Sequence, residues 1–161
     1  MTGFKVAGAA ALVALSFAAA PAQAVISSPF RAMAGTWSGG GMLSMANGEQ
    51  QRLRCRASYN VAGRGDALSL NLRCASDSYN FDLTGNVEDR NGAISGEWSE
   101  ATRNASGTIS GRAAGDHIEA AARGQNFSAN LSLTTRGNRQ TVSIHPEGTD
   151  VRDVSLALAR R

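Results

Sequence analysis

The stretch "GTWSGGGMLSM" (35–45) separates a tryptophan from three consecutive glycines by a single serine. From Trp37 onward apolar residues recur at every second position, and no stretch keeps the helical period of about 3.6 residues. On an extended strand Trp37 shares its face with Gly39 and Gly41, where glycine marks a sharp bend or the close approach of a second backbone. The stretch therefore predicts the first strand of an all-β domain, bent at its glycines.

Turn residues divide the rest of the chain into short segments with the same alternation. The apolar face changes parity between most successive segments, as antiparallel hairpins with two- or four-residue loops require. Two-residue loops are predicted at Ala101-Thr102, Gly115-Asp116, Gly124-Gln125 and Gly137-Asn138. The loop at Ala101-Thr102 would place Trp98 opposite Ala105.

The segments predict a single up-and-down antiparallel meander of about eight to ten strands over residues 35–161. Such a meander closes most simply into a barrel, because closure removes the exposed strand edges. The apolar face would point inward, and the opposite face is rich in Ser, Asn, Arg and Asp. We therefore expect a soluble barrel, with a flattened barrel or a β-sandwich as the alternative.

The N-terminal residues have the pattern of a secretory signal peptide. Lys5 is followed by an apolar run over 6–20 and by the small-residue site Ala22-Gln23-Ala24. The run is shorter than the ~20 residues that span a bilayer, so we do not expect an integral membrane protein. Cleavage of residues 1–24 would leave a segment 25–34 before the domain and would place the domain in the periplasm or outside the cell.

Two cysteines lie on neighbouring predicted strands. Placing Cys55 opposite Cys74 gives a regular hairpin whose turn is "GRGD" (63–66). An even number of cysteines in an exported chain favours a disulfide. We therefore predict a cross-strand bridge between these two residues.

The sequence resembles the calycins, which include the lipocalins and avidins, in its Gly35-Thr36-Trp37 opening. The resemblance implies that Trp37 plugs one end of the barrel over a preceding 3₁₀ turn in the segment 25–34. It also implies that a late arginine, Arg160 or Arg152, packs on the tryptophan ring. It also implies an interior site for a small apolar ligand. Inward positions for such a site are Trp37, Tyr59, Tyr79, Phe81, Trp98 and Phe127.

A second resemblance concerns the whole domain. The cysteine pair and the strand "SGEWSE" (95–100) resemble those of a group of exported proteins of alphaproteobacteria. That group implies no activity. The biotin site of the avidins is not implied, because "SGGGM" (38–42) follows the first tryptophan and only one further tryptophan is present.

No catalytic constellation is recognisable, so we do not expect an enzyme, a cofactor or a metal site. His117 and His145 lie in predicted turns, with no nucleophile or third ligand at motif spacing. Glu97 and Glu100 flank Trp98 and are expected to face outward. The net charge of +3, of which Lys5 supplies one, is too small to indicate a nucleic-acid partner.

An arginine stripe, Arg52, Arg54, Arg56 and Arg73, is expected on the outer face. Its first-strand neighbours would be Gly40, Met42 and Ser44, and only Asp82 could neutralise part of its charge. Because guanidinium binds carboxylate and phosphate in bidentate fashion, the stripe suits an acidic envelope glycan. A solvated face that keeps the sheet soluble is the alternative.

Two functions follow as hypotheses. The first is an exported, non-enzymatic barrel that binds a small apolar or amphipathic ligand in its interior. The alternative is a periplasmic or secreted interaction protein, which would bind an acidic glycan through the arginine stripe or inhibit a secreted protease through the segment "VISSPFRAMA" (25–34).

Overall fold

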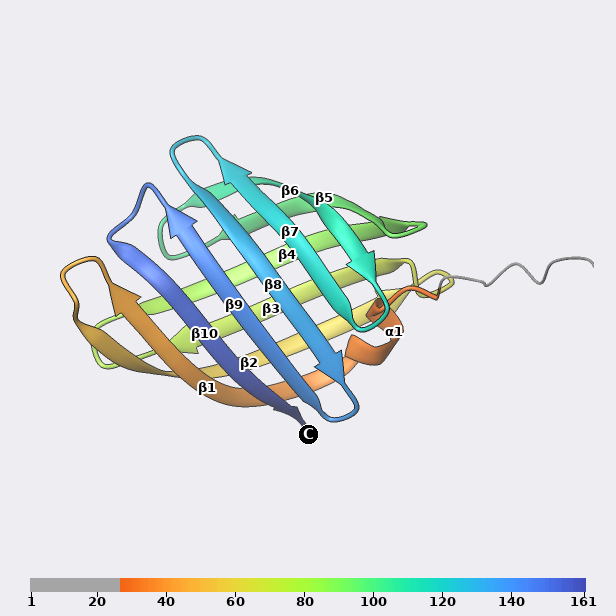
Figure 1. Cartoon of the computed structure of the whole chain (residues 1–161), viewed down its shortest axis with the longest axis horizontal. Coiled ribbons are helices and arrows are strands. Elements are labelled where there is room, and N and C mark those ends of the chain that lie inside the picture. The colour runs from red at the N-terminus through yellow and green to blue at the C-terminus, as the bar shows by residue number, and fades with distance from the viewer. Residues whose placement is uncertain (1–26) are drawn as a thin grey trace, which may run out of the picture.

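Ten antiparallel strands follow one another around a closed barrel in the computed structural model, which describes residues 27–161 (Figure 1). A single helical turn precedes them. Within this part of the chain no helix is long and apolar enough to cross a membrane. The elements are α1 (Phe30–Met33), β1 (Gly35–Met45), β2 (Gln50–Ala62), β3 (Ala67–Ala75), β4 (Asn80–Arg90), β5 (Ala93–Glu100), β6 (Ala105–Ala114), β7 (His117–Gly124), β8 (Ser128–Arg136), β9 (Arg139–Glu147) and β10 (Val151–Arg160).

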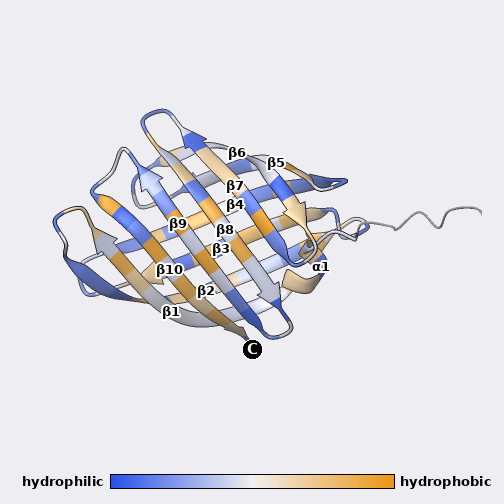
Figure 2. Ribbon diagram, viewed as in Figure 1, coloured by the Kyte–Doolittle hydropathy of each residue, from blue (hydrophilic) through white to orange (hydrophobic). Residues whose placement is uncertain are grey.

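Pairing of β1 with β10 closes the barrel, with Trp37 opposite Arg160 and Leu43 opposite Val154. All the remaining pairings join strands that are consecutive in the sequence. The predicted up-and-down barrel is therefore confirmed, and the sandwich alternative is excluded. Apolar and polar residues alternate along the strands, as expected for one face turned inward and one outward (Figure 2).

The three glycines of β1 lie where neighbouring backbones come closest. A Cβ on Gly39 or Gly41 would overlap carbonyl oxygens of β10, and a Cβ on Gly40 would overlap the Leu53 carbonyl oxygen of β2. Glycine at these positions lets β1 bend between its two partner strands without a side-chain clash. The predicted close approach is confirmed, and it explains why glycines follow the tryptophan.

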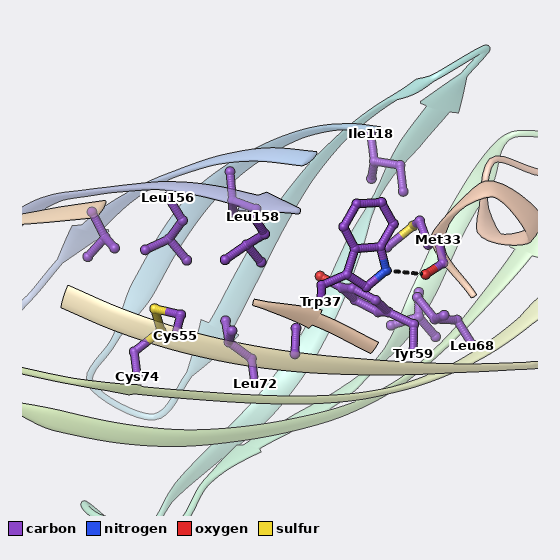
Figure 3. Packing of buried hydrophobic residues seen from close by; sticks show 14 of the residues in the cluster. Met33, Trp37, Cys55, Tyr59, Leu68, Leu72, Cys74, Ile118, Leu156 and Leu158 are labelled. Carbon is purple, nitrogen blue, oxygen red and sulfur yellow. Dashed lines mark hydrogen bonds between the residues drawn. A yellow bond between two sulfur atoms is a disulfide. The ribbon is translucent and has the colours of Figure 1, made fainter. Parts of the chain in front are cut away.

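Trp37 closes one end of the barrel together with α1. Its side chain is 0% exposed, and its Nε1 donates a 2.7 Å hydrogen bond to the Met33 carbonyl oxygen (Figure 3). The Arg160 guanidinium lies 4.5 Å from the ring centre and donates to the carbonyl oxygens of Ala32 and Ala34. Of the two predicted arginines Arg160 therefore packs on the ring, as a cation–π contact.

Cys55 and Cys74 are directly opposite each other and form a disulfide. The turn between β2 and β3 spans 63–66, as the cysteine register predicted. Both cysteines point inward among buried residues (Figure 3). The bridge fixes the register of β2 against β3, and with it the position of every outward residue on these strands.

Two predicted loops are wrong in position, each by a register shift of two residues. Residues 101–104 form a four-residue loop, so Trp98 lies opposite Gly107 rather than Ala105. Gly124 belongs to β7, and the next turn is over 125–126, because the Gly124 amide donates to the Phe127 carbonyl oxygen. A Cβ on Gly124 would lie 3.2 Å from the Trp98 ring, so this glycine serves close packing instead of a turn.

Glu100 corrects a third expectation. It faces inward and is only 9% exposed, whereas we expected it to face outward with Glu97. Its carboxylate accepts hydrogen bonds from the amides of Asp82, Thr102 and Arg103. Burial alone would raise the pKa of Glu100, but these hydrogen bonds outweigh it and hold the pKa below its usual value. The residue thus orders the 101–104 loop as an ionised cap.

Candidate functional site

The interior has two unlike walls. The wall of β10, β1, β2 and β3 carries large apolar side chains, including Leu43, Leu53 and Leu156, each at most 3% exposed. The opposite wall, from β5 to β8, alternates small inward residues with large ones such as Ile94 and Ile118, and it carries a second, smaller cluster of buried side chains around Trp98. The small inward residues are Gly96, Gly107, Gly111, Ala120, Ala122 and Ala129. The three glycines lie where a neighbouring backbone comes close, because a Cβ on each would overlap a carbonyl oxygen of an adjacent strand.

Apolar side chains on the small-residue side are incompletely covered. Ile109, Leu131 and Ile144 point inward from β6, β8 and β9 and are half-buried, although each lies within its strand. In a closed barrel an inward side chain can meet solvent only through space inside the barrel or through its mouth. These three side chains pack against the buried cluster of Trp98, Ala122 and Ala129, so solvent reaches them from within the barrel or through its nearby open end.

Four of the six predicted interior aromatic residues gather at the end opposite α1. Tyr79 and Phe81 make an edge contact with ring centres 6.4 Å apart, and Trp98 and Phe127 make another at 5.4 Å. Arg103 lies 4.2 Å above the Tyr79 ring. These residues form an aromatic rim, of which Tyr79, Phe81 and Phe127 are half-buried.

The other two predicted aromatic residues, Trp37 and Tyr59, lie in the closed end and are 0% and 5% exposed. The Tyr59 hydroxyl donates a 2.7 Å hydrogen bond to Gln140, whose amide donates to the Thr135 hydroxyl. Burial raises the pKa of Tyr59, and the hydrogen bond to Gln140 offsets this increase only in part. This buried polar chain went unpredicted, because a lone inward Gln or Thr gives no sequence signal.

The outer surface carries a groove over β1, β2 and β3, with a volume of about 500 Å³. Three members of the predicted arginine stripe line it, and Arg52 does not. Arg161, which the sequence analysis missed, completes the set. We call this feature the arginine groove; its lining residues are Ser38, Gly39, Arg54, Cys55, Arg56, Arg73, Cys74, Ala75 and Arg161.

The strand neighbours of the stripe differ from expectation by two residues. Arg52, Arg54 and Arg56 lie opposite Met42, Gly40 and Ser38, rather than the predicted set that included Ser44. The predicted pairing of Arg56 with Arg73 is confirmed.

The two histidines lie apart from both features. His117 contacts the Thr134 hydroxyl at 2.9 Å, and His145 contacts the Asp153 carboxylate at 2.5 Å. Among residues 27–161 no group of three His, Cys, Asp or Glu side chains lies close enough to hold a metal ion. The predicted signal peptide, 1–24, is outside the described residues.

A comparison with solved structures supports the fold alone. The crystal structure of Rv2717c from M. tuberculosis matches with a TM-score of 0.65 and 14% sequence identity, over 81% of this chain and 93% of that chain. No protein-family model matches the sequence, and no curated protein sequence is significantly similar to it. The barrel architecture is therefore shared with a known structure, at an identity that carries no function.

Proposed function

We propose that this protein is an exported, non-enzymatic binding protein that holds a small apolar or amphipathic ligand inside its barrel. The observation that carries the proposal is the half-buried state of Ile109, Leu131 and Ile144, which point into a closed barrel. Water in contact with such side chains is displaced favourably by an apolar ligand.

The ligand would enter at the aromatic rim. The other end is filled by α1 and Trp37, and Phe30 and Met33 of α1 are 1% and 2% exposed. At the rim, Arg103 and the Tyr79 hydroxyl supply polar groups beside aromatic rings. This combination suits a ligand with an apolar body and a polar or anionic head.

The inhibitor alternative would use the segment before the barrel. Its residues Phe30 and Met33 are buried in α1, and Arg31 donates to the Arg64 carbonyl oxygen at 2.9 Å. A protease-binding tail would therefore have to lie N-terminal to α1. We favour the interior ligand, because it explains both the half-buried inward side chains of Ile109, Leu131 and Ile144 and the aromatic rim.

Ala120 and Ala121 offer a matched test, because they are adjacent on β7 and point to opposite faces. Ala120 faces Gly111 and Leu131 inside the barrel, so A120L would occupy interior room. We expect A120L to abolish binding of the apolar dye N-phenyl-1-naphthylamine and to leave the unfolding midpoint in urea unchanged or higher. A121L should bind the dye like the wild type.

A packed interior predicts a different result for the same pair. A120L would then lower stability by about 1–3 kcal/mol, the usual cost of overpacking, and the wild type would bind no dye. Native mass spectrometry of protein purified from its own cells provides an independent measurement. An adduct that is lost on denaturation supports the proposal, whereas a bare chain together with a destabilised A120L would contradict it.

A further inference from the structure

The arginine groove lies on the outer wall, separate from the interior, and its positive charge is poorly balanced. Of its four arginines only Arg73 has an acidic partner among the described residues, Asp82 at 2.9 Å. Arg161 donates to the Ser38 hydroxyl at 2.6 Å, and Arg54 and Arg56 make no ion pair within residues 27–161. Three guanidinium groups therefore keep their charge and most of their donors free for a ligand.

The fold holds these like charges together against their repulsion. Arg56 and Arg73 are directly opposite across β2 and β3, an arrangement that is unfavourable unless an anion lies between the side chains. The Cys55–Cys74 disulfide is the adjacent pair in the same ladder, so the strands cannot slip to separate the two arginines. The opposition is thus built into the barrel.

Small residues keep the groove open. Ser38 and Gly40 point outward from β1, and their partners on β10 are Ala159 and Ala157. The arginine side chains of β2 and β3 lie on one side of these small residues. Arg161, which follows the end of β10, lies on the other side. The volume of about 500 Å³ falls within the ~300–1,000 Å³ typical of small-ligand sites.

The spacing of the arginines favours a ligand with several anionic groups. Arg54 and Arg56 are two residues apart on one strand, which places their backbones about 7 Å apart. Arg161 is reached across β1, so it lies roughly two strand spacings, about 10 Å, from β2. A single small anion cannot use all these guanidinium groups at their full bidentate geometry, whereas a chain with repeated charges can.

From this geometry we infer that the arginine groove binds an acidic polysaccharide, whose carboxylate or sulfate groups pair with Arg54, Arg56, Arg73 and Arg161. A membrane surface fits less well. Interfacial binding needs exposed apolar side chains that insert between lipids, and the lining contributes only Ala75 of that kind, with both cysteines buried. The site is independent of the interior ligand.

The test compares two double variants of equal charge. R54S/R56S removes two groove arginines, and R112S/R123S removes two outward arginines from β6 and β7. Isothermal titration with heparin and with polygalacturonate should show at least a tenfold loss of affinity for R54S/R56S and little change for R112S/R123S. Binding by the wild type should weaken as salt rises, because the contacts are exposed.

Several outcomes would overturn the inference. Equal losses in both double variants would show attraction by net charge alone, and failure of the wild type to bind either polymer would remove the site. Full competition by millimolar sulfate would indicate a small-anion site. Binding to phosphatidylglycerol vesicles in place of the polymers would identify a membrane partner. Unchanged circular dichroism and unchanged dye binding by R54S/R56S would show that the barrel and its interior are intact.

Discussion

Replacing Gly41 by alanine should disrupt the closure of the barrel. The added Cβ would lie inside the contact distance of the Ser155 carbonyl oxygen and 2.7 Å from its carbonyl carbon, so either β1 or β10 must move. Overpacking of this kind costs about 1–3 kcal/mol. Displacement of the pairing between the two strands removes at least one hydrogen bond, worth about 1 kcal/mol. We therefore expect G41A to lose about 3 kcal/mol of the free energy of unfolding.

Gly85 provides the control, because it is also an inward strand glycine and does not have a positive φ. A Cβ there would lie 3.4 Å from the Glu97 carbonyl oxygen and 3.7 Å from Leu70, which are ordinary contact distances. Alanine is favoured over glycine within a strand by about 0.5–1 kcal/mol. G85A should therefore be as stable as the wild type or slightly more stable, although the chemical change is the same.

Urea unfolding followed by far-ultraviolet circular dichroism measures both variants, with the disulfide intact. The slope of free energy against urea should stay constant, so that the shift in midpoint reports stability. The close approach of β1 to β10 would be refuted if G41A stayed within about 1 kcal/mol of the wild type. If G85A lost as much of the free energy of unfolding as G41A, any replacement of an inward glycine by alanine would destabilise the barrel, whatever its distance from the neighbouring backbone.

Two further predictions concern the disulfide and Glu100. C55A/C74A should lower the free energy of unfolding by about 3 kcal/mol, because the bridge joins residues 19 apart and restricts the unfolded chain; a loss below about 1 kcal/mol in urea titrations would contradict this. Because the folded-state pKa of Glu100 is lowered, its stabilisation is present at neutral pH and is lost as pH falls from its usual value of 4.5 through the folded pKa. Between pH 6 and pH 3 the urea midpoint of unfolding should therefore fall less steeply in E100Q than in the wild type. Parallel curves for the two proteins would show that the Glu100 carboxylate does not contribute to stability.

The register errors show how far an alternating pattern can be read. A shift of two residues leaves every side chain on its original face, so parity predicted the apolar inward residues of β5 and β6 but not that Trp98 lies opposite Gly107. Gly124 gave a second error of the same size, because glycine serves both tight turns and close contacts. Its role depends on the Trp98 ring, which lies two strands away around the barrel.

Candidate site residues were predictable where they depend on pairing between consecutive strands, and not where they depend on contacts between distant parts of the chain. The stripe on β2 and its opposition to Arg73 follow from local pairing and the cysteine register. Arg161 joins the groove only because β10 pairs with β1, a contact between residues more than a hundred positions apart. The buried chain from Tyr59 to Gln140 likewise spans the interior.

The sequence by itself determined the class of fold, the faces of most strand residues and the cysteine pairing. These features depend on periods of two residues and on nearest-neighbour hairpins, which a linear pattern encodes directly. The plug formed by Trp37 was implied by the resemblance to the calycins. Only the tertiary structure decided which residues meet where β1 pairs with β10, the contact of Gly124 with the Trp98 ring, and the arginine groove. Those properties depend on how far the strands tilt and how closely distant backbones approach, and both are set when the first strand meets the last.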